Sequence, residues 1–370
     1  MILKFISLLN FKNHGNLKVD FINEVNCFLG NNGVGKTNLL DAIYYLSFSK
    51  SYYNSLELDN VKNGEDFFMI KGLFMSDNEV DSEVTCSFLN NKKKVKFNNK
   101  NYVKLSDHIG RFPSVIITPL DSKLVLGGAD ERRRFVDKTL SQIDNNYLVN
   151  LISYNKILRQ RNTLLKKFII NSVNSDLLAT YDSKLSELGT RIYLRRKDYT
   201  AQLAGDIQKY YDIISQNDEQ IQVVYKSELE QFSFIDLLNQ NRKKDQILTY
   251  TSSGVHRDDF IFSINSQSLR KSGSQGQQKT FIIALKFAYF DLLKSISNIL
   301  PLLLLDDIFD KLDNDRVEQI IKILNNNQFG QIFITDTNFQ RIDLIMNKVN
   351  IQCKYFMFNK KGLYEKKFKN

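Results

Sequence analysis

The chain has 370 residues, of which 42% are hydrophobic and 25% charged, and its formal net charge is +10. This length suggests about two domains, with enough apolar residues for a core. The three cysteines are far apart in the sequence and show no pairing or metal-site spacing, so reduced thiols are expected. The longest apolar run is too short to span a bilayer. We therefore expect a cytoplasmic protein without a membrane partner. The basic balance is compatible with a nucleic-acid partner, and equally with a lysine-rich composition that has no specific role.

Residues 1–118 are predicted to form strands joined by turns, with one helix at 38–48 and a hairpin at Asn98–Asn99. In the middle of the chain, apolar residues recur every three or four positions over 136–158 and again over 178–210. This period predicts amphipathic helices of about 30 residues, each about 45 Å long, arranged as an antiparallel pair.

A polar break at 171–176 separates the two predicted helices, and strands alternate with helices again from about Thr249. The two ends of the chain are therefore predicted to form one discontinuous domain, residues 1–125 plus 250–370. Residues 126–249 would be an inserted, mostly α-helical lobe. The fold class is α/β, with a mixed sheet and flanking helices in the first domain.

A phosphate-binding pattern, G-x-x-x-x-G-K-T, follows the apolar stretch Val25–Leu29 and precedes a helical pattern. Its glycines let backbone N–H groups approach phosphate oxygens, and the helix N-terminus favours negative charge. We expect Lys36 to contact the β- and γ-phosphates of ATP and the Thr37 hydroxyl to bind Mg²⁺. The predicted ATP-binding residues are Gly30, Asn31, Asn32, Gly33, Val34, Gly35, Lys36 and Thr37.

A second motif, "LLLLDD", ends a continuous apolar run that is typical of a buried parallel strand. Asp306 at its carboxyl end is expected to hold Mg²⁺, directly or through water. Asp307 would lie beside the γ-phosphate, where a carboxylate can orient or deprotonate the attacking water. Together with the phosphate loop, these two residues predict a P-loop NTPase that uses Mg²⁺, without showing which kind of NTPase it is.

Three features resemble the heads of ATP-binding-cassette proteins: the P-loop, "GSQGQQK" more than two hundred residues later, and "DKLD" after Asp306. The resemblance implies a cassette-type ATPase head that carries the helical lobe as an insertion. It also implies that "GSQGQQK" is a signature motif that caps the γ-phosphate bound by a second copy of the chain. The residues that match are Ser274, Gln275, Gly276 and Gln277 for the signature, and Asp310 and Asp313 for the D-loop.

Seven segments, in order and with similar spacing, resemble the RecF family of DNA replication and repair proteins. They are "LLNFKNHGNLKVDF", "GNNGVGKTNLLDAI", "GADERRRFVDKTL", "YNKILRQRNTLLK", "SGVHRDDFIFSIN", "SGSQGQQKTFIIALKFA" and "LLLLDDIFDKLD". The resemblance implies an ATP-dependent homodimer that binds DNA at single-strand/double-strand junctions. It implies that the dimer acts with RecR and RecO to load the recombinase RecA, and that slow ATP hydrolysis resets it. The alternative that we keep open is a cassette-type ATPase scaffold that acts on protein partners without DNA.

The sequence departs from the family pattern at several positions. Pro119-Leu120-Asp121-Ser122 stands where the family usually has Pro-Glu-Asp-Leu, and of this segment only Asp121 is carried over as a candidate site residue. Val255 stands where proline is common, and Asp310 stands where serine is usual. Cassette transporters have a glutamate at the position of Asp307 and a histidine after the next strand, where this chain has "ITDTN". The shorter carboxylate and the missing histidine both favour a weak ATPase.

Two basic clusters are candidates for DNA binding, and each has an ordinary alternative. Arg132, Arg133 and Arg134 begin a helix in which acidic neighbours could pair with them. Lys156, Arg159 and Arg161 are predicted to lie on a helix face opposite the apolar stripe, where a solvated surface is the usual explanation. The lysines of the hairpin at 92–96 present the same choice, and the segment "GVHRDD" at 254–259 favours a buried ion-pair network over a nucleotide contact.

Overall fold

The computed structural model describes residues 1–76, 80–167, 175–310, 312–325, 329–349, 352–359 and 362–366. The chain divides into two compact units. The first comprises Met1–Asp121, Ile213–Ser215 and Tyr289–Asn370, and the second comprises Ser122–Asp212 and Gln216–Ala288. No helix within the described ranges is long and apolar enough to cross a bilayer.

The division differs from the predicted domain limits on the carboxyl side, because residues 250–288 belong to the second unit. Strand β10 (Asp259–Ile264), which was expected in the head, pairs along its whole length with β9 (Ile221–Lys226) of the predicted lobe. This antiparallel pairing ties the two segments together. On the amino-terminal side, the division at Asp121 lies close to the predicted limit at residue 125.

The first unit contains a six-stranded mixed sheet that carries the phosphate site. Its order is β15-β14-β3-β13-β12-β8, and all neighbours are parallel except β15 and β14. Every residue of β3, β12 and β13 is buried, as continuous apolar runs predict. The strands are β3 (Val25–Leu29), β8 (Ser114–Ile117), β12 (Leu302–Asp306), β13 (Ile332–Asp336), β14 (Cys353–Asn359) and β15 (Gly362–Lys366).

A second, antiparallel sheet of the first unit has the order β2-β1-β4-β5-β6-β7. Asn98 and Asn99 join β6 to β7 with φ values of 46° and 63°, so the predicted hairpin is confirmed as a turn with two left-handed residues. The strands are β1 (Ile2–Phe11), β2 (His14–Asp20), β4 (Phe67–Met75), β5 (Asp81–Leu89), β6 (Lys92–Phe97) and β7 (Lys100–Asn101).

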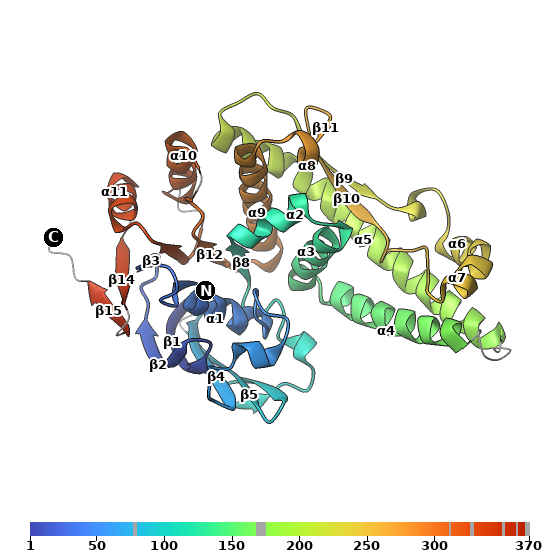
Figure 1. Ribbon diagram of the computed structural model, residues 1–370, viewed down its shortest axis with the longest axis horizontal. Coiled ribbons are helices and arrows are strands. Elements are labelled where there is room, and N and C mark those ends of the chain that lie inside the picture. Colours follow the sequence, from blue (N-terminus) through green and yellow to red (C-terminus); the bar gives the residue numbers. More distant parts are fainter. Residues whose placement is uncertain are drawn as a thin grey trace. The chain divides into compact units, whose positions relative to one another are not determined.

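Helix α1 (Lys36–Phe48) lies between the two sheets and contacts strands of both (Figure 1). It is buried on nearly every side, which explains why its sequence is apolar all round and not amphipathic. The remaining helices of this unit are α10 (Asn314–Asn325) and α11 (Phe339–Val349), with 3-10 turns at Glu57–Asn60, Leu105–Asp107 and Pro119–Asp121. Helix α9 (Gln275–Ser297) begins in the second unit and ends in the first.

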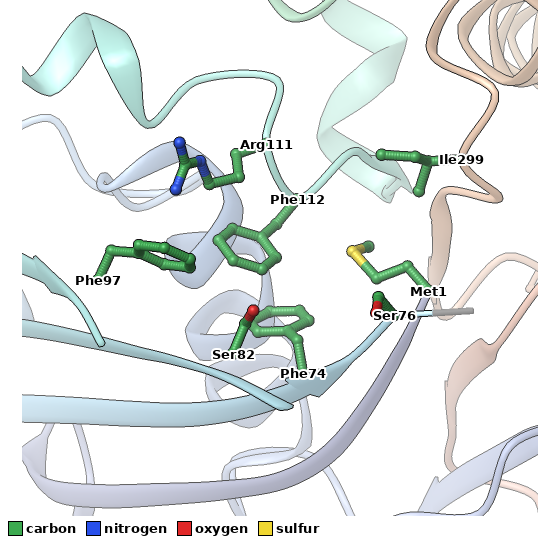
Figure 2. A pocket seen from close by; sticks show the side chains of 8 residues that line it. All are labelled: Met1, Phe74, Ser76, Ser82, Phe97, Arg111, Phe112 and Ile299. Atoms are coloured by element: carbon green, nitrogen blue, oxygen red, sulfur yellow. The ribbon is translucent and has the colours of Figure 1, made fainter. Parts of the chain in front are cut away.

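A cavity of about 240 Å³ lies beside the inner side of the antiparallel sheet (Figure 2). Three aromatic rings dominate its wall, and the Arg111 guanidinium lies 4.3 Å from the Phe97 ring centroid. None of the phosphate-site residues lines it. The lining residues are Met1, Phe74, Ser76, Ser82, Phe97, Arg111, Phe112 and Ile299.

The second unit is mostly helical, as predicted, and α4 lies alongside the long α5 (Figure 1). It also contains a three-stranded sheet, β11-β10-β9. Its helices are α2 (Ser122–Leu126), α3 (Ala129–Ile143), α4 (Asn145–Lys167), α5 (Ser175–Ser215), α6 (Phe234–Gln240), α7 (Arg242–Leu248) and α8 (Leu269–Ser272). Strand β11 spans Gln267–Ser268, and a 3-10 turn spans Glu228–Glu230.

Two predictions about these helices are wrong. The pattern over 136–158 is not one helix, because Asp144 adopts an extended conformation between α3 and α4. Its Oδ1 accepts a 3.0 Å hydrogen bond from Tyr147 N and so caps the start of α4. Helix α5 has 41 residues, about 62 Å, and is longer than the expected 30. The predicted break at 171–176 lies largely outside the described residues.

Candidate nucleotide site

The phosphate loop runs from the end of β3 into the first turn of α1, as the sequence predicts. Gly30 has φ 148° and Gly35 has φ 109°, which are backbone conformations that residues other than glycine rarely adopt. A Cβ on Gly30 would lie 2.5 Å from the Phe358 carbonyl oxygen, and one on Gly35 would lie 2.7 Å from the Asn13 and His14 side chains. These two glycines therefore allow the loop to pack closely against its neighbours.

Lys36 and Thr37 stand at the start of α1, where the sequence predicts them. The Lys36 ammonium donates to the Gly30 and Asn31 carbonyls at 2.8 and 3.0 Å, so it lies across the phosphate loop. Both the loop and the ammonium are expected to contact the nucleotide phosphates. Burial lowers the pKa of Lys36, opposed by the carboxylates of Asp307 and Asp306. Asn31, Asn32 and Gly33 are exposed at the tip of the loop, while Val34 is half-buried.

Asp306 lies beside Thr37, although 269 residues separate them in the chain. The Thr37 hydroxyl donates to Asp306 Oδ1 at 2.9 Å, and the Thr335 hydroxyl at the end of β13 donates to the same oxygen at 2.7 Å. The other oxygen, Oδ2, accepts from the Tyr53 hydroxyl at 2.6 Å. Sequence reasoning missed Tyr53, which lies in a loop after α1, and it missed the role of Thr335.

These residues fit Mg²⁺ in the manner of P-loop proteins. Mg²⁺ prefers oxygen ligands and is usually held by one or two carboxylates together with substrate phosphates. Thr37 and Asp306 supply such a hydroxyl and carboxylate at adjacent positions. Among the described residues, no cluster of three or more His, Cys, Asp or Glu side chains could hold a metal alone.

Asp307 follows directly and has φ 46°, in the left-handed region that favours glycine. Its backbone N–H donates to the Thr335 hydroxyl at 3.0 Å, which fixes the turn. Burial and then the Asp306 carboxylate raise the pKa of Asp307 to about 6, although Lys36 opposes the change. A carboxylate with this pKa is suited to accept a proton near neutral pH.

A further carboxylate that sequence reasoning missed is Asp336, at the end of β13. It is fully buried and accepts from Arg341 Nη2 at 2.6 Å and from Asn338 N at 2.7 Å. The sequence contained a signal for Asp336, since the apolar residues of "QIFITD" are followed by an acid, as in "LLLLDD". Asp121, which matches the aspartate of the family's Pro-Glu-Asp-Leu segment, is buried and accepts from Thr118 N at 2.7 Å and from the Tyr52 hydroxyl.

The signature residues begin α9 in the second unit. Ser274 and Gln277 form a reciprocal cap: Ser274 N donates to Gln277 Oε1 at 2.7 Å, and Gln277 N donates to Ser274 Oγ at 3.2 Å. Because the Ser274 oxygen accepts in this cap, its hydrogen remains available for an incoming acceptor. Gln277 also donates to Glu219 at 2.6 Å, whereas Gln275 is exposed and Gly276 half-buried.

The two D-loop candidates have different surroundings. Asp313 caps α10, because its Oδ1 accepts from Arg316 N at 2.9 Å and its Oδ2 pairs with the Arg316 guanidinium at 3.0 Å. Asp310 is exposed, and its N–H donates to the Asp307 carbonyl at 3.3 Å. Asp310 is thus joined to the backbone of the candidate catalytic residue.

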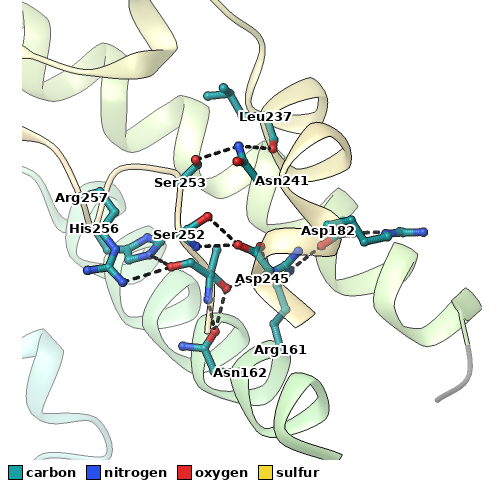
Figure 3. A network of polar contacts seen from close by, with 12 residues as sticks. Arg161, Asn162, Asp182, Leu237, Asn241, Asp245, Ser252, Ser253, His256 and Arg257 are labelled. Atoms are coloured by element: carbon teal, nitrogen blue, oxygen red, sulfur yellow. Dashed lines mark hydrogen bonds and ion pairs between the residues drawn. The ribbon is translucent and has the colours of Figure 1, made fainter. Parts of the chain in front are cut away.

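Two of the arginines predicted to bind DNA are in fact buried. Arg161 is fully buried and bonds to Asp182 at 2.6 Å and to Asp245 at 2.7 Å, a network that joins α4, α5 and α7 (Figure 3). Arg132 forms a bidentate pair with Asp259 at 2.7 and 3.0 Å and donates to two carbonyls. Their guanidinium groups are committed to protein acceptors, so the prediction that they contact DNA is corrected.

The other candidates are more accessible. Arg133 pairs with Asp130 and donates to the Asp258 carbonyl, which leaves its side chain 14% exposed. Arg134 is 70% exposed and pairs with Glu131 at 2.9 Å. Lys156 and Arg159 are exposed on α4. These positions remain predicted DNA contacts.

The segment 254–259 lies in the interior of the second unit. This agrees with the interpretation of its sequence as part of a buried polar network and not as a nucleotide contact. His256 hydrogen-bonds to the Tyr154 hydroxyl at 2.7 Å and to the Thr251 carbonyl at 3.0 Å, and burial lowers its pKa to about 4. Asp258 accepts from the Tyr225 hydroxyl and lies 3.8 Å from Arg196. The motif therefore orders the core of the second unit.

Comparison with known proteins agrees with this geometry. The sequence model of the RecF/RecN/SMC N-terminal domain matches residues 2–354. The chain is 44% identical to the DNA replication and repair protein RecF of Bacteroides thetaiotaomicron, over 96% of each chain. It is also 44% identical to RecF of Flavobacterium johnsoniae, over 96% of this chain and 99% of that one. The chain belongs to the RecF family.

Solved structures support the RecF fold. A structure described as the recombination mediator protein RecF with ATP in the RecFOR pathway has a TM-score of 0.89 and 32% identity, and it covers 99% of this chain and 98% of its own. An Smc head bound to the C-terminal winged-helix domain of ScpA has a TM-score of 0.58 at 13% identity and shows likeness of fold alone. The predicted cassette-type ATPase head with a helical lobe is confirmed.

Proposed function

We propose that the chain is an ATP-gated DNA-binding dimer that acts in recombinational repair and replication restart. ATP binds the phosphate loop of one copy, and the signature of a second copy caps its γ-phosphate. The closed dimer binds DNA at single-strand/double-strand junctions and works with RecR and RecO to promote RecA loading in the cytoplasm. Slow hydrolysis opens the dimer again.

The observation that carries the nucleotide part of this proposal is the meeting of Thr37 and Asp306 at 2.9 Å beside the phosphate loop. These two residues, far apart in the chain, form a hydroxyl-carboxylate pair of the kind that would hold Mg²⁺ beside ATP phosphates. When bound, Mg²⁺ would neutralise charge that develops on those phosphates. A solved structure of a relative, described as RecF with ATP, supports ATP as the nucleotide.

The dimer is supported by the chemistry of the signature. Ser274 presents a hydroxyl at the N-terminus of the 23-residue helix α9, where the aligned peptide dipoles favour an anion. Its cap with Gln277 fixes the serine without using the hydroxyl hydrogen. In this arrangement Ser274 contacts the γ-phosphate of the ATP bound by a second copy, and it does not need to contact the phosphate loop of its own chain.

Hydrolysis is assigned to Asp307, which would orient or deprotonate water next to the γ-phosphate. The test is ATP turnover by the wild type and by Asp307→Asn, with ATP binding measured in parallel. The proposal expects binding to persist and turnover to fall at least about a hundredfold, the usual range for loss of a general base. Turnover that is unchanged in Asp307→Asn would remove this residue from the mechanism.

A further inference from the structure

The antiparallel sheet of the first unit has one buried face and one more accessible face. Alternate residues of β1 and β4, such as Ile6, Leu8 and Ile70, are fully buried in the core. The opposite residues are half-buried or exposed. We call this second side the outer face; it consists of Phe5, Ser7, Leu9, Asn16, Lys18, Asp20, Phe67, Met69, Lys71, Leu73, Met75, Asp81, Glu83, Thr85, Ser87, Leu89, Lys92, Lys94, Lys96 and Asn101.

Strand register aligns basic and hydroxyl side chains across the outer face. One row runs Lys18, Ser7, Lys71, Thr85, Lys96 over five neighbouring strands, because each residue is paired with the next. At about 4.8 Å per strand, its three lysines are about 10 Å apart and span about 19 Å. The next row includes Ser87 opposite Lys94.

A second line of lysines runs along β6. Lys92, Lys94 and Lys96 point to the outer face at every second residue, about 6.7 Å apart. Lys93, between them, turns to the other side and pairs with Glu57 at 2.7 Å. The three outward lysines and Lys18 have no acidic partner within 4 Å among the described residues.

Acidic residues of the outer face are confined to its other end. Glu83 pairs with Lys71 at 2.6 Å, and Asp81 lies 3.8 Å from Lys4, while Asp20 is the remaining acid. The end that includes the β5–β6 hairpin therefore carries the lysines that lack an acidic partner within 4 Å among the described residues. Its Ser7, Thr85 and Ser87 hydroxyls are further donors for phosphate oxygens.

We propose that the outer face of the antiparallel sheet binds duplex DNA through its phosphates. The inference rests on the proposed DNA-binding function and gives it a second surface, on the first unit, in addition to the predicted basic contacts of the second unit. Lysine is depleted in protein–protein interfaces, so lysine and hydroxyl rows fit a phosphate backbone better than an acidic protein. The contacts are to backbone, so this face contributes affinity without reading sequence.

The test removes three charges from the outer face and three from elsewhere. Lys92→Gln/Lys94→Gln/Lys96→Gln is compared with Lys184→Gln/Lys243→Gln/Lys244→Gln, which alters exposed lysines of the second unit. Binding of a fluorescein-labelled duplex is measured by anisotropy over about 50 to 200 mM salt, with ATP binding as the check of folding. The outer-face variant should bind at least about tenfold more weakly, with a log–log salt slope smaller by about 0.9 for each phosphate that is no longer neutralised.

A gain of affinity provides the opposite check, which misfolding would not imitate. Glu83→Gln releases Lys71 from its ion pair and should tighten DNA binding by up to about fivefold, the range for an exposed pair. Unchanged affinity and salt slope in the outer-face triple variant would overturn the proposal, and so would equal losses in both triple variants. Poly-glutamate serves as a second probe, which stands for an acidic protein. If the outer-face triple variant binds DNA like wild type but no longer binds poly-glutamate, the outer face is assigned to an acidic protein. If wild-type protein itself fails to bind DNA, the proposed function fails first.

Discussion

The Tyr53 hydroxyl donates to Asp306 Oδ2 at 2.6 Å, across 253 residues of sequence. Thr37 and Thr335 donate to Oδ1 of the same carboxylate. Three hydroxyl groups from three different segments therefore hold Asp306 in one orientation beside the phosphate loop. Burial, followed by the Asp306 charge, raises the pKa of Tyr53 well above its usual value, so this phenol remains a donor at any physiological pH.

Tyr53→Phe should slow ATP hydrolysis by about tenfold or more while ATP binding without Mg²⁺ stays unchanged. A hydrogen bond to a charged group contributes about 1.5–3 kcal/mol, and its loss lets Asp306 leave the orientation that favours Mg²⁺. Steady-state turnover over a Mg²⁺ titration measures the effect. Tyr52→Phe is the matched control, because its hydroxyl donates to Asp121 and not to Asp306. Identical Mg²⁺ dependence in wild type and Tyr53→Phe would contradict this role.

Lys36→Ala should abolish ATP binding and leave the fold intact. The Lys36 ammonium donates to backbone carbonyls of its own loop, so its removal breaks no carboxylate pair within the described residues. Equilibrium binding of a fluorescent ATP analogue tests this, with urea unfolding as the measure of stability. Lys322→Ala, an exposed position on α10, serves as the control and should bind like wild type. Retained affinity in Lys36→Ala would place the phosphates elsewhere.

The rate of hydrolysis should depend on pH through Asp307. With a pKa of about 6, this carboxyl is protonated at lower pH and then cannot accept a proton from water. We expect kcat/KM to fall about tenfold per pH unit below about pH 6 and to level off above it. ATP phosphate titrates in a similar range, so ATP affinity is measured at each pH and divided out. A flat profile after this correction would exclude Asp307 as the base.

The same pKa sets the sign of a stability effect. Because the pKa of Asp307 is higher in the folded chain than in the unfolded one, the unfolding free energy falls as pH rises from about 4 to about 6. Asp307→Asn removes this penalty and should raise the unfolding midpoint at neutral pH in the absence of ATP. Urea unfolding at about pH 4 and about pH 7 measures the difference. A midpoint lowered equally at both values would indicate a structural role for the charge.

Arg161→Ala should destabilise the second unit by about 3–5 kcal/mol, since it leaves Asp182 and Asp245 buried with fewer partners. Arg159→Ala on the same helix is exposed and should change stability by less than about 0.5 kcal/mol. Urea unfolding of both variants gives the comparison. Equal small effects would mean that the network shown in Figure 3 contributes little.

The strand-loop-helix conformation around the candidate phosphate loop could be predicted from sequence because its parts are local. Gly30, Lys36 and Thr37 lie within eight residues, and the strand and helix on either side follow from apolar patterns. Tyr53 could not be predicted, since nothing near it in sequence reveals a partner on β12. The identity of the Asp306 partners depends on which strands are neighbours, and strand order is not contained in any single segment.

Arg161 was misplaced although the sequence contained a signal. Tyr154 and Leu165 are buried residues of α4, and Arg161 lies seven positions after the first and four before the second, on the same helix face. A charged residue on an apolar stripe indicates a buried ion pair. Its acidic partners lie 21 and 84 residues away, so they could not be named from sequence.

The most direct test of an ATP-gated dimer is light scattering of the wild-type chain with and without ATP, beside Ser274→Ala and Lys36→Ala. We predict the monomer mass of 43.1 kDa without nucleotide and twice that mass with Mg²⁺ and a non-hydrolysable ATP analogue. Lys36→Ala should remain monomeric because it does not bind ATP, and Ser274→Ala should remain monomeric although it does. A wild-type mass that is the same with and without nucleotide would contradict the account.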